Sequence, residues 1–96
     1  ENGFVRRAVS LPSPGLKGEM IEGALPAGAS VAYEASPVAG LEHHLYLLSG
    51  SLRLDIEGTE YRLEAGDCLR YVLFGPSSFS SDGPEEARYV LAMVHP

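Results

Sequence analysis

The adjacent pair His43-His44 is the most conspicuous chemistry-bearing feature of this 96-residue chain. Imidazole serves near neutral pH as an acid or base, a hydrogen-bonding group or a metal ligand. Neighbouring side chains of a β-strand point to opposite faces, so the two imidazoles cannot hold one ion from a single strand. Three roles stay open for His43: a pocket residue that hydrogen-bonds a ligand, a buried histidine with a backbone partner, or a metal ligand.

Arg70 is a second candidate, because it interrupts an apolar run between Leu69 and Tyr71. Arginine is rarely buried without a partner. Either Arg70 points outward to an acidic side chain, or it points into the fold and meets an anionic ligand, which its planar fork suits. Cys68 is the only cysteine, so no intramolecular disulfide forms, and we expect it to pack as a small buried hydrophobe. The chain has no nucleophile elbow, phosphate loop or dinucleotide fingerprint.

Short strands must position these residues. Eleven Gly and seven Pro interrupt the chain too often for long helices. Between them, apolar and polar residues alternate with a period of two, which is typical of half-buried strands. We expect strands over residues 4–9, 17–24, 30–34, 43–49, 51–57, 59–63, 68–72, 77–81 and 88–94. This regular spacing predicts an all-β jelly roll or barrel rather than a βαβ fold.

The clearest local pattern is a hairpin over residues 51–63. Its apolar residues alternate with charged ones, and Glu57-Gly58 supplies a tight turn between the two strands. A second turn over residues 64–67 places Asp67 to bond backbone amides. The predicted core residues are Leu45, Leu47, Leu52, Leu54, Ile56, Leu63 and Phe79, with Tyr61 on the same face and Arg53 on the exposed one.

Size and charge restrict the function. A 10.2 kDa chain builds one domain, which we place at residues 17–96, preceded by an N-terminal arm or linker over residues 1–16. The net charge of −6 would repel a phosphate backbone, so these residues should not bind DNA themselves. Apolar runs are too short to span a membrane, and the single cysteine favours a reducing cytoplasm.

Residues 40–50 and 58–67 resemble the cupin superfamily, and the resemblance extends over about residues 25–94. It implies a cupin jelly roll, also described as a double-stranded β-barrel. Aligning the first motif on Gly50 places His43 at the family's Glu position, and the two motif histidines then fall within residues 36–39, which contain no metal donor. Aligning the second motif on Gly66 places its Pro, Gly, His and Asn at Val72, Phe74, Ser77 and Ser81. We therefore expect a cupin without its metal, and no cofactor.

Residues 26–28, 48–50, 61–67 and 87–91 are similar to the C-terminal cupin domain of bacterial helix-turn-helix regulators of the Cro/repressor (XRE) type. The resemblance implies a ligand-sensing and dimerising domain rather than an enzyme. It also implies that DNA is bound only through an upstream domain, and a chain that begins at Glu1 fits a domain cut from such a regulator. Two alternatives remain: a stand-alone small cupin enzyme or metal-dependent binding protein, and a structural module whose interior is filled by its own side chains.

The same alignment predicts where the effector binds. His43 and Ser77 should face each other across the barrel mouth and anchor a small polar or anionic molecule. Phe79 would line this pocket, and Arg70 would be a third contact if its strand turns that way. We further expect a homodimer, because such regulators read paired half-sites and because the arm around residues 4–9 is apolar enough to pair with a partner's sheet.

Overall fold

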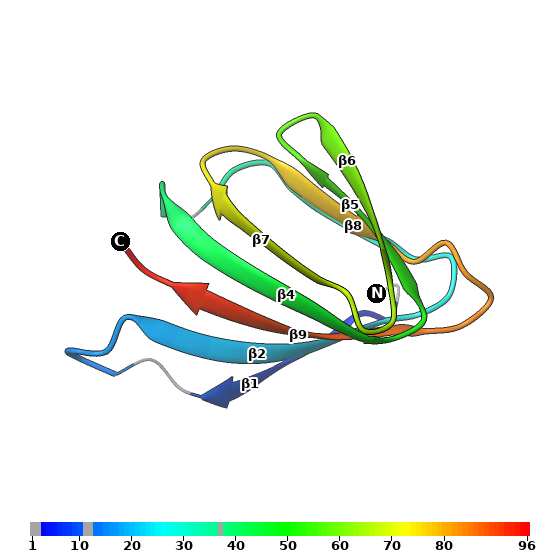
Figure 1. Cartoon of the computed structure of the whole chain (residues 1–96), viewed down its shortest axis with the longest axis horizontal. Coiled ribbons are helices and arrows are strands. Elements are labelled where there is room, and N and C mark those ends of the chain that lie inside the picture. Colours follow the sequence, from blue (N-terminus) through cyan, green and yellow to red (C-terminus); the bar gives the residue numbers. More distant parts are fainter. Residues whose placement is uncertain (1–2, 11–12, 37) are drawn as a thin grey trace.

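The computed structural model describes residues 3–10, 13–36 and 38–96, which form two β-sheets and no helix (Figure 1). Residues 1–2 and 11–12 of the expected arm, and residue 37 in the segment aligned with the motif histidines, lie outside the described residues. No helix in the described ranges is long and apolar enough to cross a membrane. The strands are β1 (Val5–Ser10), β2 (Gly18–Leu25), β3 (Ser30–Tyr33), β4 (Leu41–Ser49), β5 (Ser51–Ile56), β6 (Thr59–Glu64), β7 (Cys68–Leu73), β8 (Ser77–Ser80) and β9 (Ala87–Val94).

The strands pair in an order that differs from their order in the sequence. The larger sheet has the order β1-β2-β9-β4-β7 and the smaller one β3-β8-β5-β6, with all pairs antiparallel. Figure 1 shows the larger sheet on one side of the molecule and β8, β5 and β6 on the other. The central pairs join distant segments, such as β2 with β9, as a jelly roll requires. The all-β prediction is confirmed.

The predicted strands and turns agree with the structure. Each expected strand is present, and its ends lie within two residues of the observed ones. In the β5–β6 turn Glu57 and Gly58 both have positive φ, 53° and 91°, which matches the twist of a two-residue hairpin. The second predicted turn is also found, and the backbone N–H of Glu64 donates a hydrogen bond to Asp67 Oδ2 at 2.8 Å.

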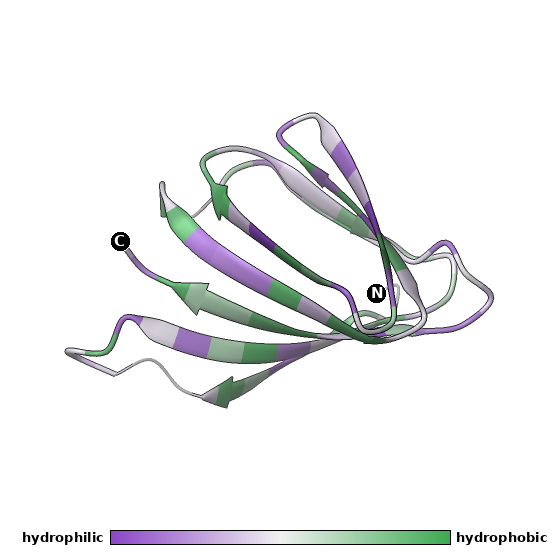
Figure 2. Cartoon of the chain, viewed as in Figure 1, coloured by the Kyte–Doolittle hydropathy of each residue, from purple (hydrophilic) through white to green (hydrophobic). Residues whose placement is uncertain are grey.

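The core fills the space between the sheets. Along β4, the buried residues of the inner face, Leu41, His43, Leu45 and Leu47, alternate with more exposed residues of the outer face. Figure 2 shows hydrophobic (green) and hydrophilic (purple) segments along this strand. All seven predicted core residues are buried. Tyr61 remains 37% exposed on the inner side of β6, because β6 is an edge strand with no neighbour on its far side. The buried apolar residues are Ile21, Leu25, Leu41, Leu45, Leu47, Leu52, Leu54, Ile56, Leu63, Leu73, Phe79, Ala87, Tyr89, Leu91 and Met93.

The prediction that Cys68 packs in the core is wrong. In β7 the more buried positions are Leu69, Tyr71 and Leu73. Alternation therefore turns Cys68 and Arg70 to the outer face, and Cys68 is exposed. The apolar neighbour Leu69 made Cys68 resemble a core residue, but adjacent residues of a strand occupy opposite faces.

The segment expected to be an arm contains a strand of the larger sheet. Residues 5–8 pair with residues 24–21 of β2, and the register shifts between Ala8 and Ser10. Every residue of β1 is exposed, because this edge strand has only one neighbour. Its pairing nevertheless fixes which side chains of β1 face the interior, and one of them reaches the site described next.

Candidate ligand pocket

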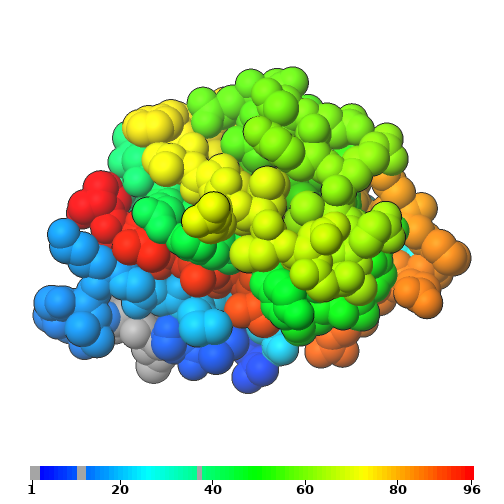
Figure 3. Space-filling model, in the orientation of Figure 1, coloured from blue at the N-terminus to red at the C-terminus, as the bar shows by residue number. Residues whose placement is uncertain are grey.

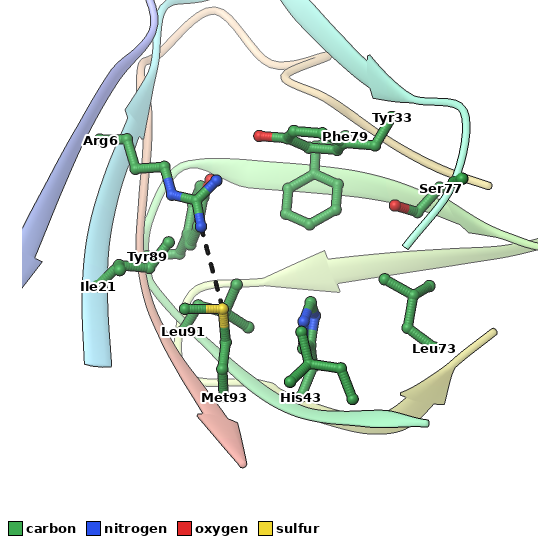
Figure 4. Close-up of a pocket in the computed structure, with 12 residues that line it drawn as sticks. Arg6, Ile21, Tyr33, His43, Leu73, Ser77, Phe79, Tyr89, Leu91 and Met93 are labelled. Carbon is green, nitrogen blue, oxygen red and sulfur yellow. Dashed lines mark hydrogen bonds between the residues drawn. The ribbon is translucent and has the colours of Figure 1, made fainter. Parts of the chain in front are cut away.

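A cavity of about 100 Å³ lies between the two sheets (Figure 4). Several of its lining residues lie where β4 and β8 begin and where β7 and β9 end. Side chains from both sheets, including one from the edge strand β1, line it. They are Arg6, Ile21, Tyr33, Ala35, Leu41, His43, Leu73, Ser77, Phe79, Tyr89, Leu91 and Met93.

His43 is on the inner face of β4 and is only 7% exposed. Its cross-strand neighbour on β7 is Tyr71, whose hydroxyl lies 3.0 Å from His43 Nδ1. The other ring nitrogen, Nε2, is buried and has no hydrogen-bond partner in the described structure. His44 lies on the opposite face and contacts the carboxylate of Glu42 through its own Nε2. The prediction that the two imidazoles face opposite ways is confirmed.

The environment of His43 keeps its imidazole neutral. Burial lowers its pKa from the ordinary 6.5 to about 4, and the nearby positive charge of Arg6 adds to this effect. Burial also raises the pKa of the Tyr71 phenol, so that its hydroxyl keeps its proton. When this hydroxyl donates to Nδ1, the imidazole proton is on Nε2, which is then an N–H donor; in the other tautomer Nε2 is an acceptor.

Ser77 and Phe79 reach the same cavity from β8 of the smaller sheet. Ser77 is 6% exposed, and Figure 4 shows its hydroxyl directed inward opposite His43. The Phe79 ring packs edge-on against Tyr33 and Tyr89, with ring centroids 6.2 and 5.8 Å apart. The structure thus brings together His43, Ser77 and Phe79, three of the four residues that the sequence suggested.

Arg70, the fourth, does not line this cavity. It lies on the outer face of β7, where it borders a shallow groove with Glu42 and His44. The Arg70 side chain therefore points outward, which was one of the two alternatives. The other alternative, in which Arg70 points inward as a third pocket contact, is wrong. The reason is again the alternation of β7, in which Tyr71 takes the inward position.

The cation at this pocket is Arg6, which the sequence analysis did not single out. Arg6 pairs with Gly23 of β2, and Gly23 pairs with Tyr89 of β9, so the three residues form one row across the sheet. A Cβ atom at Gly23 would lie 2.3 Å from the Tyr89 ring, and this glycine leaves the space that the ring occupies. From this row the Arg6 guanidinium points into the cavity, where Nη2 lies 3.9 Å from Met93 Sδ (Figure 4).

The sequence gives no local indication of this role for Arg6. Arg6 and Arg7 are adjacent and of the same type, and only the register of β1 on β2 decides which one faces inward. Arg7 faces outward and forms an ion pair with Glu22 at 2.7 Å. Arg6 forms no ion pair with a carboxylate among the described residues.

Comparison with known proteins identifies the architecture. No family model and no curated protein matches the sequence. Among solved structures, the Cupin_2 domain of an XRE family transcriptional regulator from Enterobacter cloacae superposes with a TM-score of 0.88 at 19% identity, over 97% of each chain. The chain has the cupin fold.

Two further cupin-like structures are similar. An HTH_3 family transcriptional regulator from Vibrio cholerae gives a TM-score of 0.87 at 14% identity, and the match covers 97% of this chain but only 51% of that one. The Schizosaccharomyces pombe Cnp3 cupin domain gives 0.83 at 14% identity, covering all of this chain and 67% of that one. At these identities the likeness establishes the fold, and the predicted fold class is confirmed.

The cupin resemblance implies a metal site with three imidazoles and a carboxylate as ligands. The residues of this pocket do not supply that set of ligands. At the corresponding place the structure offers one imidazole, His43, and one hydroxyl, Ser77. In the described ranges no three His, Cys, Asp or Glu side chains come together. A hydroxyl is a poor ligand for a divalent ion at neutral pH, and one of the two His43 nitrogens already bonds to Tyr71. The donor set favours hydrogen bonds to an organic molecule.

Proposed function

We propose that this cupin is the ligand-sensing and dimerisation domain of a bacterial transcriptional regulator that acts in the cytoplasm, with DNA bound by an upstream helix-turn-helix domain. The observation that carries the proposal is the cavity lined by His43, whose Nε2 is buried and has no hydrogen-bond partner in the described structure. A buried polar atom without a partner costs about 1–3 kcal/mol, which a hydrogen-bonding ligand would recover. The likeness to the two regulator structures supports the regulatory context.

Binding rather than catalysis suits the acid–base groups of this pocket. A general base works best when its pKa lies near the working pH. Burial holds the pKa of His43 at about 4, and burial raises the pKa of Tyr71 far above neutral pH. Both groups therefore keep one protonation state near neutral pH and serve as fixed hydrogen-bond partners. A bound molecule would then act by favouring one arrangement of the domain over another.

The arm around residues 4–9 was expected to pair with a partner's sheet, but its strand β1 pairs with β2 of the same chain. We therefore propose that the dimer interface lies on the outer face of the larger sheet. Tyr46 and Leu48 lie two residues apart on the outer side of β4 and are 45% and 43% exposed, and Cys68 of β7, the cross-strand neighbour of Tyr46, is exposed as well. In the space-filling view, the residues of these two strands form part of the visible surface (Figure 3). Exposed apolar groups of this kind are typical of protein–protein contacts. Light scattering on the 10.2 kDa chain should give the mass of a dimer, and a monomer at high micromolar concentration would contradict this part of the proposal.

The ligand-binding part of the proposal is tested by a thermal-shift screen of small polar molecules on three proteins. A ligand present at about 100 times its dissociation constant should stabilise the wild-type domain by about 2.7 kcal/mol. His43→Ala should remove this stabilisation. His44→Ala is the matched control, since this histidine lies on the opposite face, and it should keep the stabilisation. If no compound stabilises the wild type, or if both variants respond like it, the pocket is not a sensing site.

A further inference from the structure

We infer that the molecule bound here is a small carboxylate with a compact apolar body, and that Arg6 pairs with its carboxylate. The inference rests on the proposed function, namely that the cavity binds a ligand, and adds the chemical class of that ligand. Three independent features support it: the charge of the wall, the position of the guanidinium, and the size and apolar character of the rest of the cavity.

The described residues in the wall of the cavity carry one positive charge and no negative one. Among them Arg6 is the single charged side chain, since none is Asp or Glu and burial holds His43 neutral. This contrasts with the protein as a whole, whose net charge is −6. An anion is therefore attracted to this cavity although it is repelled by most of the surface.

The guanidinium of Arg6 is available for a ligand. Among the described residues no carboxylate is within ion-pair distance of it, and its hydrogen-bond contact is the weakly accepting sulfur of Met93. The neighbouring Arg7 has the opposite arrangement, because its guanidinium is already bound to Glu22. A planar fork that meets no carboxylate within the protein suits a bidentate contact with a carboxylate from outside.

The remaining wall sets the size and polarity of the ligand body. Leu41, Leu73, Phe79 and Leu91 supply aliphatic and aromatic surface. The volume of about 100 Å³ is smaller than the roughly 150 Å³ of an engineered apolar cavity that holds benzene. A short branched aliphatic group therefore suits the space beside the charged end better than an aromatic ring. The Nε2 of His43 adds one hydrogen-bonding position for a polar atom on that body.

The test compares acids with neutral molecules of the same shape. We would titrate isobutyrate and isovalerate, and the amides isobutyramide and isovaleramide, into ¹⁵N-labelled protein and follow the backbone amides of pocket residues. Both acids should bind with dissociation constants on the order of 1 mM, and their amides at least about tenfold more weakly. Arg6→Gln should weaken acid binding at least about tenfold and leave the amides unchanged, because a hydrogen bond to a charged group is lost. Arg7→Gln is the matched control and should bind the acids as the wild type does.

Each contrary result has a distinct meaning. Equal binding of acid and amide, or equal effects of Arg6→Gln and Arg7→Gln, would overturn the assignment of Arg6 as the anion contact. If neutral compounds shift the His43 resonances while neither acid does, the anion inference fails and the proposed sensing function stands. If no compound of either class, nor any in the thermal-shift screen, affects the pocket, the proposed function itself fails.

Discussion

The buried imidazole of His43 should make the stability of the domain depend on pH in a predictable direction. Its pKa is about 4 in the folded protein and 6.5 in the unfolded chain, since burial disfavours the charged form. Between these values the unfolded state binds a proton that the folded state does not bind. The contribution of the neutral His43 to the free energy of unfolding is therefore fully present above pH 6.5 and is lost as the pH falls toward 4.

The size of this effect follows from the two pKa values. Lowering the pH from about 7 to about 5 should remove about 2 kcal/mol of unfolding free energy through His43 alone, as an order of magnitude. Arg6 and Tyr71 face this imidazole, and neither changes its charge between these pH values, because an arginine stays protonated and burial raises the pKa of the Tyr71 phenol. Within this cluster, the loss of unfolding free energy should therefore come from protonation of His43.

Urea denaturation at the two pH values measures the loss in wild-type protein and in His43→Gln. Carboxylates elsewhere titrate in both proteins, so the difference between their pH dependences isolates the histidine. His44→Gln serves as control and should keep the loss assigned to His43. If His43→Gln loses as much stability as the wild type between these pH values, the burial of a neutral imidazole at this position is refuted.

Three further outcomes follow from the fold. Leu54→Ala should cost about 2–5 kcal/mol of unfolding free energy, because Leu54 is fully buried. Arg53→Ala, on the other face of the strand, should cost no more than about 0.5 kcal/mol. A loss of less than about 0.5 kcal/mol for Leu54→Ala would show that Leu54 does not face the core. Gly50→Ala should destabilise the domain by more than Gly58→Ala in chemical denaturation, since both glycines have positive φ, but only at Gly50 would a Cβ lie 2.4 Å from a backbone carbonyl oxygen; equal losses would contradict this. Cys68 should react with a thiol reagent in the native protein, because it is exposed on β7, and reaction only after denaturation would show that it is buried.

The strands were predictable from sequence because their signal is local. A period of two, interrupted by glycine and proline, marks each strand, and a pair such as Glu57-Gly58 marks a turn that the structure realises with positive φ. Cys68 shows the limit of this reasoning. Its side-chain direction depends on the parity of β7, which the pairing with β4 fixes and which its neighbours in sequence do not reveal.

The pocket was only partly predictable, for a related reason. His43 and Ser77 were found through a family motif that places both at the barrel mouth, and their strands hold them there. The contacts that set their chemistry come from pairing between distant strands. Tyr71 reaches His43 through the register of β4 on β7, and Arg6 enters through the register of β1 on β2. Neither register can be read from one strand alone.

The imidazole nitrogen spectrum of His43 tests the central claim most directly. The claim is that Nε2 of His43 forms a hydrogen bond with a ligand bound in the cavity. In wild-type protein labelled on its histidine rings, a compound that binds should shift the Nε2 resonance of His43 and leave that of His44, on the opposite face, unchanged. A bound compound that leaves the His43 resonance unmoved, or that shifts only His44, would contradict the account.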